Sequence, residues 1–232
     1  MENAPEKQFS VGWTLLRVAS IWLMSYIGYY AFLPVFGFGS GYNGSPVAIT
    51  AYYVFWIVVS LITFRHIFED WRPIENRLNI FLFLAVSFLG MAIFAAYAIP
   101  NLPSIVWTEP WAPPELMVAN SWYFLPKAAE IFLQQLLIAA LVLTFFERNY
   151  SMRSITWWCV ILFGGAHFLL AFGGVPAGYV IRFTLSAAIF GAIFPRLILR
   201  VPNGFAYSYT LHWVYYAITI VMAHTVSPYA VF

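Results

Sequence analysis

The residue of this sequence whose chemistry most needs an explanation is Glu130, in the stretch PKAAEIFLQQLL of residues 126–137. This stretch opens a long apolar segment, and no other acidic residue lies inside an apolar segment of the sequence. An ionisable side chain in hydrocarbon is costly, and it marks a functional site by default. Gln134 follows four residues later, so in a helix it lies on the same face as Glu130. Glu130 is therefore the first candidate for a functional residue, with Gln134 in support.

Four further polar residues fall inside other apolar segments: His167, Arg182, His212 and Tyr216. At the rise of an α-helix, His167 and Arg182 lie about 8 Å and about 7 Å from the outer ends of their segments, similar to the depth of Glu130. His212 is expected about 12 Å from the inner end of its segment, and Tyr216 follows one turn later, closer to the shared level. The sequence therefore predicts polar groups from three helices at a similar depth, with His212 of a fourth helix deeper by an amount that helix tilt can close.

A glutamate and a histidine in a membrane cavity have a specific chemical meaning. The two side chains can hold one water molecule, and the carboxylate can take its proton as the water attacks a carbonyl carbon. A second histidine with a hydrogen-bonding neighbour can stabilise the resulting oxyanion. This set of residues predicts a metal-free hydrolase that acts inside the bilayer.

Simpler interpretations of the same residues stay open. Glu130 can pair with Lys127, three residues earlier, at the outer membrane interface. Arg182 can extend its long side chain to the lipid headgroups. A single histidine in a membrane helix can be a hydrogen-bonded packing residue. The predicted site therefore depends on these residues occurring together.

The composition predicts an integral membrane protein. Of the 232 residues, 62% are hydrophobic and only 9% are charged, whereas a soluble domain carries about 25% charged residues. The net charge of +2 gives no reason to expect nucleic acid as a partner. The lone cysteine, Cys159, allows no disulfide framework and is expected to be a buried thiol. The sequence contains no cysteine metal-site spacing and no glycine-rich phosphate motif, so no metal and no cofactor are expected.

We expect an all-α fold with seven transmembrane helices in a single membrane domain, residues 1–232. Each apolar run is close to the ~20 residues that cross a bilayer as a helix, and none alternates as a barrel strand would. The expected spans are 13–36, 47–64, 79–99, 125–146, 154–172, 177–194 and 205–223.

The basic residues predict the orientation of these spans. One set of connections carries eight of them, and the opposite set carries only Lys127. Since basic residues stay in the cytoplasm, the amino terminus is expected inside and the carboxy terminus outside. The proline-rich connection 100–123 is then external, as an interfacial loop or as a lid over a cavity. The residues of the basic set are Lys7, Arg65, Arg72, Arg77, Arg148, Arg153, Arg196 and Arg200.

Three motifs, on residues 126–217, resemble those of the CPBP family, the CAAX prenyl endopeptidases and bacteriocin-processing membrane proteins. AEIFLQQLL, residues 129–137, is similar to the first motif, Glu-Glu-x-x-x-Arg. ILFGGAHFLL, residues 161–170, is similar to the second, Phe-x-x-x-His, with Phe163 and His167. Residues 186–217 resemble the stretch leading into the third motif, with its histidine at His212. The resemblance makes these four helices the motif-bearing core.

The resemblance implies an intramembrane glutamic peptidase, in which Glu130 and His167 activate water and His212 with its neighbour stabilises the oxyanion. The chain departs from the family pattern in its first and third motifs. Either Ala129 stands at the first glutamate and Gln134 at the arginine, or a one-residue shift makes Glu130 the first glutamate. Tyr216 stands where the family has asparagine. We hypothesise that Arg182, from another helix, replaces the missing arginine as the counter-ion of Glu130.

Two functions therefore remain in view. The first is an intramembrane endopeptidase that cleaves a membrane-embedded peptide or protein in or near the bilayer. The second is a non-catalytic member of the same fold that binds a peptide, a lipid or a partner membrane protein. A haem protein is disfavoured, because His212 and His224 lie about 120° apart on one helix. In either case we expect contact with membrane lipid in the cytoplasmic membrane of a bacterium or archaeon.

Overall fold

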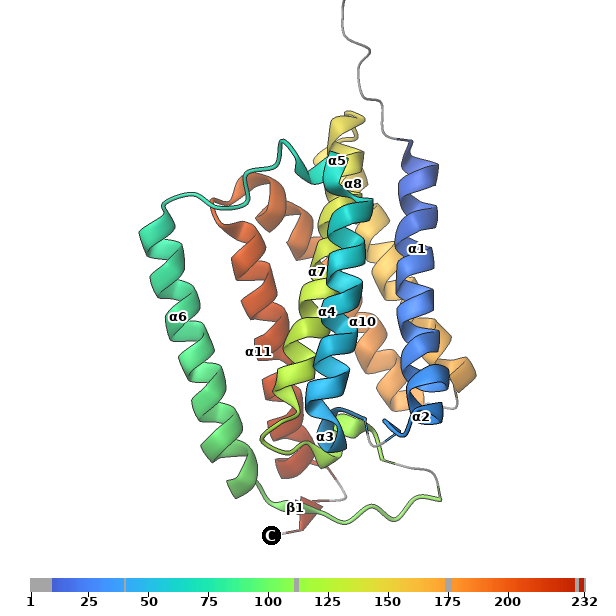
Figure 1. Ribbon diagram of the computed structural model, residues 1–232, viewed down its shortest axis with the longest axis vertical. Helices are drawn as coiled ribbons and strands as arrows, with labels where there is room; N and C mark the ends of the chain where they lie inside the picture. The colour runs from blue at the N-terminus through green and yellow to red at the C-terminus, as the bar shows by residue number, and fades with distance from the viewer. Residues whose placement is uncertain (1–9, 40, 111–112, 174–176, 228–229, 232) are drawn as a thin grey trace, which may run out of the picture. The chain divides into compact units, whose positions relative to one another are not determined.

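The computed structural model describes residues 10–39, 41–110, 113–173, 177–227 and 230–231 (Figure 1). Most of them are helical, which confirms the predicted all-α class. Lys7 of the basic set, and Trp111 of the proline-rich connection 100–123, lie outside the described residues. Six helical segments are long and apolar enough to cross a membrane: Val11–Val35, Pro46–Thr63, Arg77–Asn101, Phe124–Glu147, Met152–Phe172 and Ala177–Arg200.

These segments begin and end within about two residues of the predicted spans, except at one end. The helix α10 (Ala177–Arg200) does not end at Phe194, the predicted end of the sixth span, but continues through Pro195 to Arg200. Phe194 and Pro195 are both buried, so packing holds the helix together past the lost hydrogen bond. The predicted seventh span corresponds to α11 (Gly204–Thr225), which is not among the six.

Three of the six segments are built from consecutive helices and helical turns. α1 (Val11–Ile27) runs into a π-helical turn, Gly28–Phe32, and then α2 (Leu33–Val35). α6 (Arg77–Ile93) runs into a π turn, Phe94–Ala98, and a 3₁₀ turn, Ile99–Asn101. α8 (Met152–Cys159) is followed by a π turn, Val160–Gly164, then α9 (Gly165–His167) and a 3₁₀ turn, Phe168–Gly173.

The other elements of the described residues are α3 (Gly41–Gly44), α4 (Pro46–Thr63), α5 (Arg65–Phe68), β1 (Ser104–Ile105), the 3₁₀ turn Glu115–Val118, α7 (Phe124–Glu147) and β2 (Ala230–Val231).

The chain divides into two compact units. Unit 1 comprises Met1–Ser20, Leu61–Glu75 and Gln135–Ser208, and unit 2 comprises Ile21–Ser60, Asn76–Gln134 and Tyr209–Phe232. Helices α1, α4, α7 and α11 each contribute residues to both units. The units are therefore not successive stretches of sequence, and the single membrane domain stays a prediction.

Unit 1 is built on close contact between α10 and the segment formed by α8 and the π turn after it. Small residues make this approach possible. Gly164 faces Ala188, and Gly191 lies so close to the backbone of Cys159 that a Cβ atom there would sit 2.7 Å from the Cys159 carbonyl oxygen. Cys159 is buried, as expected from the sequence.

Local capping sets where the helices of unit 1 turn. Asn149 adopts a positive φ of 59° just after α7, which ends that helix. Ser151 then caps α8, since its side-chain oxygen accepts a hydrogen bond from the backbone N–H of Ser154. The sequence NYSMRS therefore specifies the tight connection between these two helices.

Unit 2 is held by aromatic rings and by side-chain bonds to backbone. Phe124 packs against Trp213 of α11 with ring centroids 4.2 Å apart, and Phe94 contacts both rings. His224 Nδ1 donates to the carbonyl oxygen of Pro103 at 2.7 Å. β1 and β2 pair antiparallel, Ser104 opposite Val231. The proline-rich connection is thus partly packed into this unit, with Leu116 and Met117 buried.

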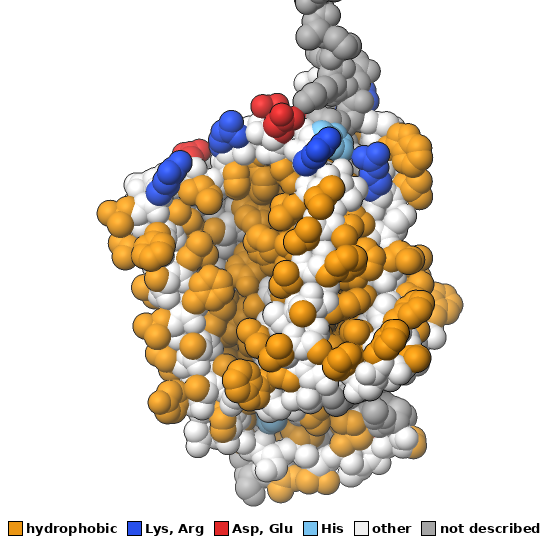
Figure 2. Space-filling model, viewed as in Figure 1, with side chains coloured by type: hydrophobic (Ala, Val, Ile, Leu, Met, Phe, Trp, Pro, Cys, Tyr) orange, Lys and Arg blue, Asp and Glu red, His pale blue; other side chains and the backbone are white. Residues whose placement is uncertain are grey.

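Large hydrophobic side chains also cover much of the outside of the helices. Figure 2 shows hydrophobic side chains over most of the visible surface of the helices. On α6, Phe81 and Val86 are 67% and 70% exposed. Exposed apolar area on this scale marks a surface that meets lipid or another protein rather than water.

The Gly191 contact predicts a selective loss of stability. Gly191→Ala places a methyl group against backbone that cannot move away cheaply, so we expect a cost of about 1–3 kcal/mol in the free energy of unfolding. The matched control is Gly165→Ala, because Gly165 has open space at its Cβ position. Unfolding of both variants in mixed detergent micelles measures the difference. Equal stabilities would show that α10 does not pack this closely.

Candidate functional site

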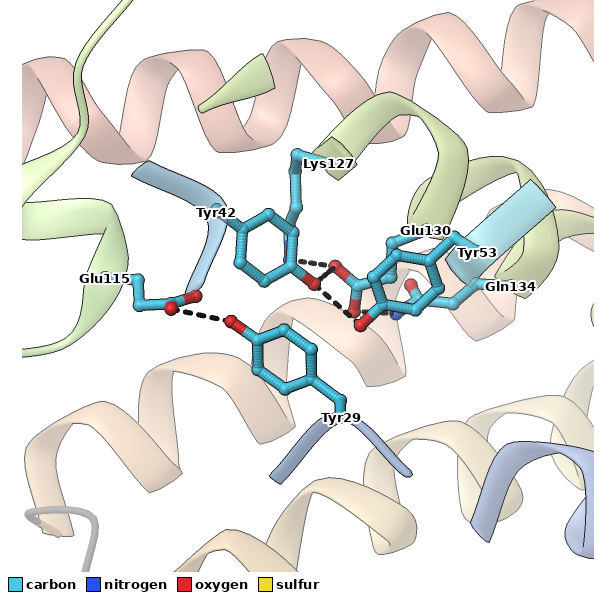
Figure 3. Close-up of polar contacts among 7 residues, drawn as sticks. All are labelled: Tyr29, Tyr42, Tyr53, Glu115, Lys127, Glu130 and Gln134. Atoms are coloured by element: carbon cyan, nitrogen blue, oxygen red, sulfur yellow. Dashed lines mark hydrogen bonds and ion pairs between the residues drawn. The ribbon is translucent and has the colours of Figure 1, made fainter. Parts of the chain in front are cut away.

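Three polar residues of α7 lie on one face of its first turns. Lys127, Glu130 and Gln134 are spaced three and four residues apart, which brings their side chains together in a helix. Lys127 Nζ lies 2.6 Å from Glu130 Oε2, and Gln134 Nε2 donates to Glu130 Oε1 at 2.9 Å. Figure 3 shows both contacts. Glu130 therefore has an ionic partner on its own helix, the simpler of the alternatives that the sequence left open.

A tyrosine from another element completes the surroundings of this carboxylate. Tyr42 of α3 donates from its hydroxyl to Glu130 Oε2 at 2.7 Å, and Tyr53 of α4 lies 2.8 Å from the same hydroxyl (Figure 3). Because Tyr42 uses its one proton toward Glu130, Tyr53 is the donor in the second contact. Burial, and then the charge of Glu130, raise the pKa of Tyr42 well above its ordinary value. Tyr42 is therefore a stable hydrogen-bond donor.

The positive charge of Lys127 is compensated by two rings as well as by Glu130. Its Nζ atom lies 4.0 Å from the centroid of the Tyr216 ring and 5.4 Å from that of Tyr42. Such cation–π contacts contribute most where water is excluded, and the Lys127 side chain is only 9% exposed. Lys127 is thus a buried charge with all of these partners inside unit 2.

A second carboxylate, Glu115, belongs to the same group of side chains. Tyr29 donates from its hydroxyl to Glu115 Oε1 at 2.6 Å, and the Tyr29 ring contacts those of Tyr42 and Tyr53. Gly41 has a φ of +62°, and a Cβ atom there would overlap Glu115 Oε1, so only glycine fits. Burial raises the pKa of Glu115, to which the charge of Glu130 also contributes.

Hydrogen bonds from the loop before α7 fix Glu115 in place. Asn43 Nδ2 donates to the Glu115 carbonyl oxygen at 3.3 Å, and the backbone N–H of Asn120 donates to Asn43 Oδ1 at 2.9 Å. A further bond joins Asn120 Nδ2 to the Asn43 carbonyl oxygen. The part of the proline-rich connection that carries Glu115 is therefore tied to α3. We define the polar cluster as Tyr29, Tyr42, Tyr53, Glu115, Lys127, Glu130, Gln134 and Tyr216.

Four of the residues predicted from the sequence lie in this cluster or in contact with it. Glu130, Gln134 and Tyr216 are members, and His212 stacks on Tyr216 with ring centroids 5.5 Å apart. His212 is buried. All four belong to unit 2.

The other three predicted residues lie in unit 1. His167 Nδ1 donates to the carbonyl oxygen of Phe163 at 2.7 Å, one turn back, which orients the imidazole ring. Arg182 is half-buried on α10. Because these residues and Glu130 belong to different units, the shared water of Glu130 and His167 and the pairing of Glu130 with Arg182 stay predictions.

The sequence reasoning missed Glu115 and the tyrosines of the first two helical segments and of α3 between them. Tyr29, Tyr42 and Tyr53 are common residues at membrane interfaces, so nothing in their spacing distinguishes them. Glu115 carries a weak signal, since it is an acidic residue among prolines and apolar residues in PPELMV. Among the described residues, no group of three histidine, cysteine or acidic side chains is placed to hold a metal.

Comparison of the chain with family models, with curated proteins and with solved structures gives no match. The resemblance to the CPBP family therefore rests on the three motifs alone.

The ion pair predicts strong coupling between its two members. Glu130→Gln leaves the buried Lys127 without its carboxylate partner, and we expect a loss of about 3–5 kcal/mol in the free energy of unfolding. Lys127→Met should also destabilise, and the variant Lys127→Met/Glu130→Gln should lose about 0.5–3 kcal/mol less than the sum of its two single changes. Unfolding of wild type, the two single variants and the double variant in detergent measures this coupling energy.

A control cycle pairs Glu130→Gln with Tyr52→Phe. The hydroxyl of Tyr52 donates to the Ser25 carbonyl oxygen and shares no partner with Glu130. These two changes should be additive. Additivity in the Lys127–Glu130 cycle as well would contradict the ion pair.

Proposed function

We propose that this chain is a non-catalytic, membrane-embedded binding protein whose polar cluster holds a hydrogen-bond donor of a membrane peptide or partner membrane protein. The observation that carries this proposal is the set of donors around the Glu130 carboxylate. Lys127, Tyr42 and Gln134 all donate to it from within unit 2.

These donors fill most, but not all, of the hydrogen-bonding positions of the Glu130 carboxylate. A carboxylate offers about four acceptor positions, two on each oxygen. Both positions of Oε2 are taken by Lys127 and Tyr42. Gln134 takes one position on Oε1. One position remains for a donor from a ligand, and the Glu130 side chain is 17% exposed.

A peptide is the ligand that suits the remaining acceptor position of Glu130 best. In hydrocarbon an unsatisfied backbone N–H group costs several kcal/mol, so an unwound membrane segment needs acceptors from its partner. The remaining position of Glu130 is such an acceptor. A saturated lipid chain carries no donor to match it.

The second candidate is the intramembrane endopeptidase, and Glu115 is the observation that favours it. A pair of carboxylates in different surroundings can divide the roles of acid and base. Glu115 has a raised pKa because it is buried, whereas Glu130 lies against an ammonium group. Glu115 would then stand in for the carboxylate that Ala129 lacks, and His167 would join Glu130 on the attacking water.

One experiment separates the two functions. Purified protein in lipid nanodiscs is given synthetic single-span peptides, and wild type is compared with Glu130→Gln and His167→Ala. We expect equal background cleavage from all three proteins, because none activates water. If wild type cleaves a peptide and both variants are folded but do not cleave it, the peptidase function replaces the binding proposal.

The binding arm uses a photo-cross-linking amino acid at Ala129, beside Glu130. We expect cross-linking to a subset of the peptides, with a roughly tenfold lower yield in Glu130→Gln, since a charged acceptor is lost. Tyr52→Phe is the control and should leave the yield unchanged. An unchanged yield in Glu130→Gln would reject the cluster as the binding site.

The proposed setting is the cytoplasmic membrane of a bacterium or archaeon, with seven spans, the amino terminus inside and the carboxy terminus outside. The clustering of basic residues in alternate connections supports the orientation. The 22 residues of α11 support a seventh span, since this length crosses a bilayer.

Cysteine labelling tests this topology in a Cys159→Ser background. Gly44→Cys and Thr225→Cys should react with an impermeant maleimide on intact cells, whereas Arg77→Cys should react only after lysis. All three positions are exposed. Protection of Thr225→Cys from the reagent on intact cells would contradict the prediction that α11 crosses the membrane.

A further inference from the structure

A cavity of about 410 Å³ lies in unit 1, and none of its lining residues belongs to the polar cluster. Its walls are the loop after α5, the ends of α7 and α10, and the turn into α11. All of its lining residues belong to unit 1. The volume lies within the range of about 300–1,000 Å³ that is usual for ligand pockets.

Charged side chains of both signs line this cavity. The basic residues are Arg72 and Arg200, and the acidic ones are Asp70, Glu75 and Glu147. No ion pair joins any of these two basic and three acidic side chains, all of which the structure describes. The cavity therefore presents positive and negative groups that are not neutralised by each other.

The arginines and acids differ in how they are placed. Arg72 donates from Nη1 to the carbonyl oxygens of Glu69 and Trp71, at 2.9 and 3.4 Å, which holds its guanidinium against the loop. Glu147 is the last residue of α7, and Arg200 is the last of α10. Helix carboxyl ends carry partial negative charge and favour a cation nearby. Two such ends meet this cavity and add to the effect of the acids.

The walls of the cavity are formed in advance. The backbone N–H of Glu75 donates to Asn203 Oδ1 at 2.7 Å, and the Trp71 ring stands perpendicular to that of Phe205 at 5.1 Å. Asn203 is buried with a positive φ of 59°. A Cβ atom on Gly204 would overlap the Leu197 carbonyl oxygen, so the turn needs glycine there. Little ordering is thus required when a ligand enters.

Apolar side chains complete the lining. Ile67 and Ile198 are buried beneath the charges, and Phe146 and Val201 are exposed beside them. Two helices that are long and apolar enough to span a membrane end here, so the cavity lies at the depth of the lipid headgroups. An occupant needs an anionic part, a cationic part and an adjoining apolar part.

We propose that this cavity binds the headgroup of a phosphatidylethanolamine-type lipid. The phosphate diester lies between Arg72 and Arg200, and the primary ammonium donates to the carboxylates of Asp70 and Glu147. The glycerol and the start of the acyl chains run along Phe146 and Val201. A choline headgroup has no N–H to donate, and an anionic headgroup leaves the acids without a cation.

The test is native mass spectrometry of the purified full chain, titrated with phosphatidylethanolamine, phosphatidylcholine and phosphatidylglycerol of the same acyl chains. We expect phosphatidylethanolamine to bind about tenfold more tightly than either of the others, the effect of losing one charge-assisted hydrogen bond or more. Equal binding of the three lipids would overturn the proposal. A soluble arm uses glycerophosphoethanolamine, and binding as tight as that of the lipid would show a soluble ligand instead.

Two variants of opposite charge assign the site. Arg200→Gln and Asp70→Asn should each weaken phosphatidylethanolamine binding about tenfold and reduce its advantage over the other lipids. The matched controls are Arg196→Gln, one turn earlier on α10, and Glu69→Gln, next to Asp70, since neither residue lines the cavity. Circular dichroism checks that each variant is folded. Loss of binding in the controls, or none in both site variants, would reject the assignment.

Discussion

The buried ion pair of Lys127 and Glu130 is the constraint on which the polar interior of unit 2 depends. An ammonium and a carboxylate removed from water need more than each other, because desolvation can exceed their attraction. Further partners are Gln134 on the same helix and Tyr42 from α3, which donate to the carboxylate, and the Tyr216 ring from α11, which lies against the ammonium group. Three elements distant in sequence are thereby held around one carboxylate.

The same constraint explains why a loop belongs to the cluster. Tyr42 can reach Glu130 only if α3 is held in place, and α3 is bound to the 115–120 segment through Asn43 and Asn120. Glu115 enters the cluster by this route. Its carboxylate occupies the space that a side chain at position 41 would fill. Gly41 in its left-handed conformation, the Glu115 carboxylate and the Tyr42 hydroxyl therefore form one arrangement.

The helices of unit 1 pack in a different way, because they meet through small residues rather than through charges. Gly164 and Gly191 allow the backbone of α10 to approach the α8 segment. The charged residues that line its cavity lie at the ends of α7 and α10 and in the loop after α5.

The sequence by itself determined the helices and the acid at the centre of the cluster. Long apolar runs broken by proline, glycine and basic residues give helix positions to within about two residues, since a bilayer allows little other backbone structure. It could not place the end of α10, because packing around Pro195 decides whether a helix survives a lost hydrogen bond. Spacing along α7 brought Lys127, Glu130 and Gln134 together, since these contacts are local. Only the tertiary structure decided that Tyr42, Tyr53 and Glu115 surround them, because contacts between residues far apart in sequence depend on how helices pack and leave no periodic pattern.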